Sequence, residues 1–152
     1  MLVPTFPMST KFPRSCYDQT GGLVYFARLA EKIRLHAAGA LGKDYLDNLG
    51  KGFDERCCNF LGVKYDDLKK QVLAGASDET ALQWCLEHGR HPGADEITEF
   101  NEFLIKRGWR DSATPRLRLR LKEAKLEHRL GEILTFFDFI EVDEGRTPPK
   151  FP

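Results

Sequence analysis

Glycines divide the chain into short segments, and most of these segments have helical periodicity. Apolar residues recur three or four positions apart, as on the face of a helix that packs against a core. Ser, Thr or Asp before a segment and Gly after it are typical helix start and stop signals. The pattern predicts an all-α fold, a compact bundle of about six or seven short helices. The expected helices cover residues 21–41, 54–61, 65–74, 78–88, 95–107, 115–128 and 135–145.

One segment contains conflicting signals. The sequence RLRLRL at 116–121 alternates strictly between charged and apolar residues, which is typical of a strand. The Thr114-Pro115 pair before it is typical of the first turn of a helix. The residues after it, KEAKLEH, have high helix propensity. A lone strand would also lack a pairing partner, so we expect a helix from Pro115 to about His128.

The length of 152 residues indicates one domain. Residues 1–19 contain three prolines and little periodicity, so we expect an extended arm packed on the domain. Residues 20–146 are expected to form a single helical domain, and residues 147–152 a loose tail. The four cysteines form no Cys-x-x-Cys pair, and the N-terminus does not resemble a secretory leader. A cytoplasmic protein with reduced thiols is expected, without a membrane-spanning segment.

Charge is balanced overall, with 23 Lys and Arg against 23 Asp and Glu. A zero net charge argues against a protein dedicated to nucleic-acid binding. The expected helix 115–128 nevertheless has a basic stripe, formed by Arg118, Lys122, Lys125 and Arg129. Leucines flank this stripe on both sides, which suggests a helix wedged between two surfaces. One of these surfaces could belong to a second copy of the chain, so a homo-oligomer through this helix is one expectation.

Arg34 lies in the apolar arc of the first expected helix. Four small residues surround it one or two turns away, namely Ala27, Ala30, Ala37 and Ala38. A buried guanidinium is costly unless it is paired and hydrogen-bonded. We therefore expect a partner for Arg34: a carboxylate such as Asp54 or Asp138, a group of carbonyls, or a bound anion. The alternative is an internal salt bridge, or an arginine at the edge of the arc beside Glu31.

The other side of the same helix has Arg28, Lys32 and His36 at successive turns. Such a face is solvated in most helices, but it can also hold an anion. Arg14 and the amides of Gly21 and Gly22, at the expected helix start, could contribute to the same site. The candidate anion-binding residues are therefore Arg14, Gly21, Gly22, Arg28, Lys32 and Arg34.

Two further groups have catalytic residue types. Cys85, His88 and His91 could form a nucleophilic pair, or could bind zinc with Cys57 or Cys58, but their spacing demands neither. A core cysteine with two surface histidines is the expected arrangement. The C-terminal acids are expected to form a solvated face, with a paired-carboxylate hydrolase as the alternative. These acids are Asp138, Glu141, Asp143 and Glu144. No metal site or cofactor is predicted.

A series of short motifs covers nearly the whole chain in one order. It includes PRS at 13–15, GGLV at 21–24, FDERCCNFLGV at 53–63, ASDETALQWC at 76–85 and FFDFIEVDEGR at 136–146. Together these motifs resemble the bacterial domain-of-unknown-function 5069 family. The resemblance implies a small helical protein of the bacterial cytosol and assigns no activity. The preferred hypothesis is a non-catalytic module that binds an anionic small molecule or a protein partner. The alternatives are a small hydrolase-like enzyme and an oligomerisation or regulatory module.

Overall fold

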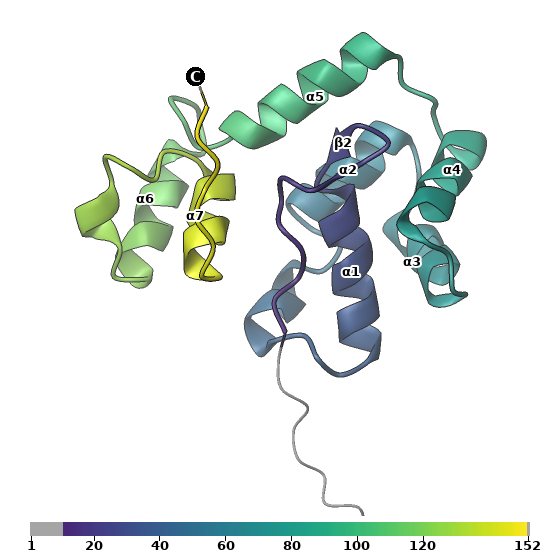
Figure 1. Cartoon of the computed structure of the whole chain (residues 1–152), viewed down its shortest axis with the longest axis horizontal. Coiled ribbons are helices and arrows are strands. Elements are labelled where there is room, and N and C mark those ends of the chain that lie inside the picture. Colours follow the sequence, from purple (N-terminus) through teal and green to yellow (C-terminus); the bar gives the residue numbers. More distant parts are fainter. Residues whose placement is uncertain (1–10, 152) are drawn as a thin grey trace, which may run out of the picture.

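The computed structural model describes residues 11–151 and is mostly helical, which confirms the predicted fold class. This part of the chain contains seven α-helices, two short 3-10 helices and one two-stranded hairpin (Figure 1). In chain order the elements are β1 (Gln19–Thr20), β2 (Leu23–Val24), α1 (Phe26–Ala37), η1 (Lys43–Asn48), α2 (Phe53–Leu61), α3 (Tyr65–Leu73), α4 (Asp78–His88), α5 (Ala94–Lys106), α6 (Thr114–Glu123), η2 (Glu127–Arg129) and α7 (Phe136–Asp143). The first ten residues of the expected arm lie outside the described range.

The hairpin β1–β2 replaces the expected start of the first helix. Gly21 and Gly22 have φ angles of 55° and 81°, and positive values at both central residues are characteristic of a type I′ turn. The strands pair antiparallel, with Thr20 opposite Leu23. The expected helix start at Gly21 is therefore wrong, and α1 begins only at Phe26. It ends at Ala37 rather than near Gly42, because the chain turns at Gly39 with φ 69°.

Helix α6 settles the conflict in the RLRLRL segment. Residues 116–121 are helical, as predicted, and Leu117 and Leu121 are buried against the core. The helix is shorter than expected, because it ends at Glu123 and Lys125 adopts a positive φ of 60°. The residues up to His128 therefore form a turn and the short helix η2.

The molecule has two hydrophobic cores joined by α5. The larger core is formed mainly by the hairpin and helices α1–α4, which we call the N-terminal lobe. The smaller core is formed around Leu117, Leu121 and Ile133, in residues 107–146, which we call the C-terminal lobe. Helix α5 runs across the top of both lobes (Figure 1). Asn101 of α5 accepts a hydrogen bond from Val24 N–H and donates one to Gly22, which fixes the hairpin beneath this helix.

Residues 11–18 run alongside α1 on the side that faces α7 (Figure 1). Backbone hydrogen bonds anchor both ends of this segment, from Lys11 N–H to Ala40 O and from Tyr25 N–H to Cys16 O. The Tyr17 hydroxyl donates a 2.5 Å hydrogen bond to Asp138 on α7. This segment therefore provides a polar layer between the two lobes. None of the helices between residues 11 and 151 is both long and apolar enough to cross a membrane.

Candidate functional site

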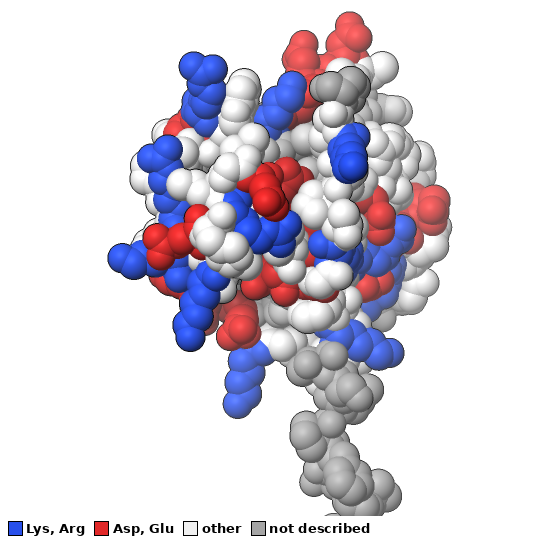
Figure 2. Space-filling view, turned by 60° about the vertical axis from the view of Figure 1, so that its left-hand side comes forward, with Lys and Arg blue, Asp and Glu red and all other residues white. Residues whose placement is uncertain are grey.

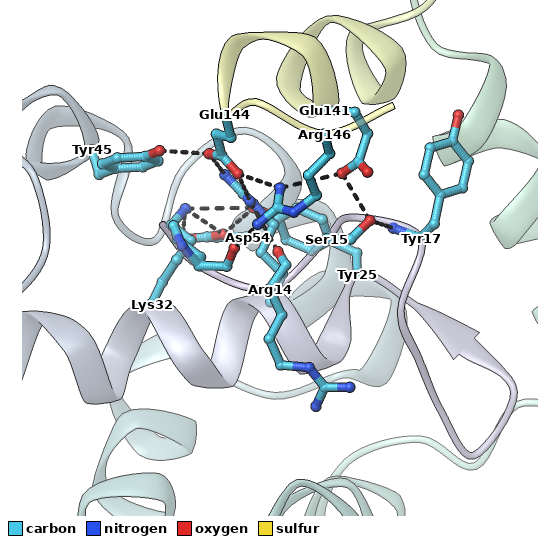
Figure 3. Close-up of polar contacts among 12 residues, drawn as sticks. Arg14, Ser15, Tyr17, Tyr25, Lys32, Tyr45, Asp54, Glu141, Glu144 and Arg146 are labelled. Atoms are coloured by element: carbon cyan, nitrogen blue, oxygen red, sulfur yellow. Dashed lines mark hydrogen bonds and ion pairs between the residues drawn. The ribbon is translucent and has the colours of Figure 1, made fainter. Parts of the chain in front are cut away.

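A buried ionic network lies where α1, α7 and the N-terminal segment meet (Figure 3). The Arg28 guanidinium donates two hydrogen bonds of 2.7 Å to the two carboxylate oxygens of Glu144. Both side chains are almost fully buried, at 4% and 3% exposure. Glu144 also accepts hydrogen bonds from the Tyr45 hydroxyl, at 2.5 Å, and from Arg146, at 2.7 Å. This carboxylate therefore joins α1, η1 and the end of α7.

A second buried pair lies one turn further along α1. Lys32 Nζ lies 3.0 and 3.1 Å from the carboxylate oxygens of Asp54, which is the second residue of α2. Asp54 has no solvent exposure, and it also accepts hydrogen bonds from the Tyr25 hydroxyl at 2.6 Å and from Gly50 N–H at 3.0 Å. Three donor groups thus make four hydrogen bonds to one carboxylate, which satisfies its hydrogen-bonding capacity.

Glu141 completes the network one turn before Glu144 on α7. It accepts a 2.8 Å hydrogen bond from the Ser15 hydroxyl and a longer one, 3.4 Å, from Arg146. Arg146 also donates to the Pro13 carbonyl. The network thus contains three cations, Arg28, Lys32 and Arg146, and three carboxylates, Asp54, Glu141 and Glu144. It is neutral overall, and its members are paired with one another.

The pKa of Glu144 reflects two opposing effects. Burial alone would raise this pKa, but the hydrogen bonds and positive charge of Arg28, with further hydrogen bonds from Tyr45 and Arg146, outweigh it and lower the pKa. The pKa of Tyr45 is raised by burial and by its hydrogen bond to Glu144, so the phenol stays protonated and donates. At neutral pH the carboxylate is therefore ionised, as the pairing with Arg28 requires.

The structure reverses the expected roles of the cations on α1. Arg28 and Lys32, expected on a solvated face, are buried at 3% and 5% exposure. Arg34, expected in the apolar arc, is partly exposed, with 37% of its side chain accessible. The reason is that the N-terminal segment and α7 cover the polar side of α1, so two sides of this helix face the interior. The expected solvated face of acids on α7 is also wrong for Glu141 and Glu144, which are both buried.

Arg34 pairs with Asp78, and with neither Asp54 nor Asp138. Its Nη1 lies 2.8 Å from Asp78 Oδ1, and its Nη2 donates to Ala76 O at 3.1 Å. The first contact is an ion pair without hydrogen-bond geometry, because no donor points toward Oδ1. Arg14 Nη1 donates a 2.8 Å hydrogen bond to the other oxygen of this carboxylate, Asp78 Oδ2. Two half-exposed guanidiniums therefore converge on one carboxylate at the start of α4.

The predicted anion-binding residues thus separate into three places. Arg28 and Lys32 lie in the buried network, where each already has a carboxylate. Arg14 and Arg34 meet at Asp78. The glycines at 21 and 22 form the hairpin turn, so their amides do not mark a helix N-terminus. Sequence reasoning missed Ser15, Tyr45 and Arg146 as network members, although PRS at 13–15 and EGR at 144–146 belong to the family-like motifs.

The proposed cysteine–histidine chemistry has no support in the geometry. Cys85 is fully buried, and burial raises the pKa of its thiol to about 12. His88 Nδ1 lies 3.0 Å from the Trp84 carbonyl, and its ring stacks on Trp84. His91 lies beside Leu86 and Ile97 at a small cavity of about 130 Å³. Within residues 11–151, no three His, Cys, Asp or Glu side chains are grouped as a metal site would require.

The burial of the thiols predicts that they are unreactive in the native protein. All four cysteines are buried, and burial raises the pKa of every thiol, to about 12 for Cys16, Cys58 and Cys85 and well above its usual value for Cys57. Because the thiolate is the reactive form, a thiol reagent at pH 8 should label none of them within minutes, and all four after unfolding in guanidinium. The measurement is absorbance of the released chromophore against time. Rapid labelling of Cys85 in the folded protein would contradict this burial and would revive the nucleophile hypothesis.

The C-terminal lobe has a second group of charges, and these are exposed. Residues 106–132 contain nine Lys and Arg against four Asp and Glu, although the whole chain is balanced. The exposed cations Arg116, Arg118, Lys122 and Lys125 have no carboxylate within 4.0 Å among residues 11–151. Figure 2, which turns this lobe toward the viewer, shows Lys and Arg side chains projecting from the left part of the face. We call Arg116, Arg118, Lys122 and Lys125 the α6 cation group.

The comparisons with known proteins agree with the sequence motifs. A family model described as "Domain of unknown function (DUF5069)" matches residues 10–146, which is nearly the whole chain. No curated protein matches the chain. The match includes the buried network, the arginines at Asp78 and the α6 cation group. The chain therefore belongs to the DUF5069 family, as the order of its motifs indicated.

Proposed function

We propose that this chain is a non-catalytic binding module whose C-terminal lobe binds an anionic partner. The observation that supports the proposal is the α6 cation group, four exposed cations without carboxylate partners on one short region of the described chain. Exposed charges of one sign attract an oppositely charged partner and accelerate its association. Because the rest of the chain has a compensating negative charge, the attraction is local to this lobe.

The buried network supports this proposal indirectly. Its three cations and three carboxylates neutralise one another, so Arg28 and Lys32 have no free charge for a ligand. In this proposal Arg28 holds the C-terminal lobe against α1, and Lys32 holds α1 against α2. The Arg28 guanidinium donates both to Glu144, the residue after α7, and to the carbonyl of Arg14. A fixed orientation of α6 lowers the entropy that binding would otherwise cost.

A small-anion site at Arg14 and Arg34 is the second candidate. It is favoured by the convergence of two half-exposed guanidiniums beside the first turn of α4, where helix amides attract negative charge. Asp78 already occupies the space between them, so an external anion would have to compete with a tethered carboxylate. We therefore expect weaker binding there than at the α6 cation group. Stabilisation by pyrophosphate that is lost in Arg34→Ala would favour this second site.

Charge reversal on α6 tests the proposed function. Fluorescence anisotropy would measure the binding of labelled poly-L-glutamate and of heparin over a series of salt concentrations. The affinity of the native protein should fall as salt rises, because screening weakens exposed charge pairs. Arg118→Glu/Lys122→Glu should weaken binding by about tenfold or more, since two attractive charges become repulsive.

The matched control is Lys51→Glu/Lys64→Glu, which makes the same change in net charge on exposed residues of the N-terminal lobe. It should alter the affinity by less than about twofold. Circular dichroism would check that both variants keep the fold. Equal losses in the two variants would show that only net charge matters, and no binding of either polyanion at low salt would overturn the proposed function.

A further inference from the structure

Exposed apolar side chains are concentrated on the lobe with the unpaired cations and on the adjoining end of α5. Nine large apolar residues in the described chain are exposed, and five of them lie between residues 103 and 134. These five are Phe103, Trp109, Leu119, Leu130 and Leu134. A surface that serves only to attract a polyanion has no need of exposed leucines, whereas protein interfaces combine apolar anchors with arginine.

The geometry of α6 places one of these leucines among the cations. Leu117 and Leu121 face the core, at 2% and 0% exposure. Each residue advances about 100° around a helix, so Leu119 points about 200° away from Leu117 and faces outward. It is 53% exposed. Its neighbours three residues before and after are Arg116 and Lys122, so two cations lie beside this apolar side chain.

The end of α5 and the turn that follows it add two aromatic side chains in contact with arginines. Phe103 has the guanidinium of Arg56, from α2, 5.0 Å from its ring centroid and that of Arg107 at 5.5 Å. Trp109 has the Arg110 guanidinium at 5.6 Å from its ring centroid. Tryptophan and arginine are the residues most enriched among those that dominate binding energy at protein interfaces. Held against the aromatic rings, the guanidiniums lose less side-chain freedom when they contact a carboxylate.

We propose that the anionic partner is an acidic protein segment with apolar side chains, and that Leu119 packs against those side chains. The inference rests on the proposed function and names the class of partner. The partner is expected to be acidic because the α6 cation group is unpaired among the described residues, and negative charge complements it. Leu119, which lies between Arg116 and Lys122 on the outer face of α6, indicates the apolar character. A leucine neither stacks on bases nor hydrogen-bonds to them, so a nucleic acid would leave these side chains unused. A second copy packed by a two-fold axis would place the same cations opposite one another.

Two designed peptides of about 20 residues, a length at which helices begin to form, test this inference. Both have the same number of Glu residues; one has Leu at i, i+3, i+4 and i+7, and the other has Ser at these positions. We expect the leucine peptide to bind the native protein about tenfold more tightly than the serine peptide. In Leu119→Ser this preference should fall to about twofold or less. Leu73→Ser, at a residue that is 48% exposed on α3, is the matched control and should retain it.

Each of the other possible results of this experiment identifies the claim that fails. If both peptides and poly-L-glutamate bind equally, the apolar contact is wrong and the proposed function stands. If a DNA duplex of equal charge binds more tightly than the leucine peptide, the partner is a nucleic acid and this inference is overturned. If sedimentation shows self-association that Leu119→Ser removes, a second copy covers the surface and the inference is also overturned. If no polyanion binds at low salt, the proposed function itself fails.

Discussion

Glu144→Gln should lower the free energy of unfolding at pH 7 by about 3–5 kcal/mol, the usual cost of removing one partner from a buried ion pair. The substitution preserves the shape of the side chain but removes its charge. Arg28 would then remain buried, at 3% exposure, without a counter-charge. The Tyr45 hydroxyl and Arg146 would lose the same acceptor. Urea unfolding monitored by tryptophan fluorescence and by circular dichroism would measure the change.

The difference between the native protein and Glu144→Gln should depend on pH. The pKa of Glu144 in the folded protein lies below its unfolded value, so the unfolded state binds the proton more tightly. The stabilisation by this carboxylate is therefore fully present above its unfolded pKa of about 4.3. It is lost as the pH falls through the lower folded pKa. The gap between the two unfolding free energies should be constant from neutral pH to about pH 5 and should narrow below pH 4.

Glu132→Gln is the matched control for this prediction. It breaks the pair between Arg129 and Glu132, whose side chains are 36% and 68% exposed. An exposed pair contributes at most about 1 kcal/mol, so this variant should unfold almost as the native protein does. A Glu144→Gln variant as stable as Glu132→Gln would show that the buried network does not hold the lobes together. Equal gaps at pH 7 and pH 3 would contradict the role of the carboxylate charge.

Local signals predicted most of the helices. Each of the seven α-helices corresponds to an expected segment, because a helix start such as Ser77, whose hydroxyl accepts from Thr80 N–H, is encoded within a few residues. The alternating segment at 116–121 was also correctly assigned, since Pro115 suits a first helical turn. The hairpin at Gly21 and Gly22 was missed for an equally local reason. Two adjacent glycines favour a type I′ turn as much as a helix start, and no residue beside them decides between the two.

The buried network could not be predicted, because its partners are distant in the sequence. Arg28 and Glu144 are 116 residues apart, and Ser15 and Glu141 are 126 apart. Helical periodicity shows which residues share a face, but it does not show that a second surface covers that face. Sequence reasoning therefore placed the buried cation of α1 at Arg34, among alanines, whereas Arg28 is buried against Glu144 and the N-terminal segment, and Lys32 against Asp54 of α2. The family-like motifs were the one sequence signal that included network residues from both ends of the chain, such as Ser15 and Glu144.

Asp54→Asn should destabilise the N-terminal lobe about as strongly, by about 3–5 kcal/mol. Asp54 has no exposure and accepts hydrogen bonds from Lys32, Tyr25 and the Gly50 amide. The asparagine would replace one acceptor oxygen by an NH₂ donor, which would face the Lys32 ammonium in either orientation, together with the Tyr25 hydroxyl or the Gly50 N–H. Lys32 would also remain buried, at 5% exposure, without a negative charge. The free energy of unfolding in urea would measure the loss.

A double-mutant cycle separates this pair from general damage to the core. Lys32→Met removes the ammonium while retaining the apolar stem, and alone it leaves Asp54 with only Tyr25 and Gly50 as donors. In Lys32→Met/Asp54→Asn no buried charge is left without a partner at this position. The double variant should therefore be more stable than the sum of the single losses predicts, by about 1–3 kcal/mol. Strictly additive losses would mean that Lys32 and Asp54 act independently, and that their 3.0 Å contact does not hold α1 to α2.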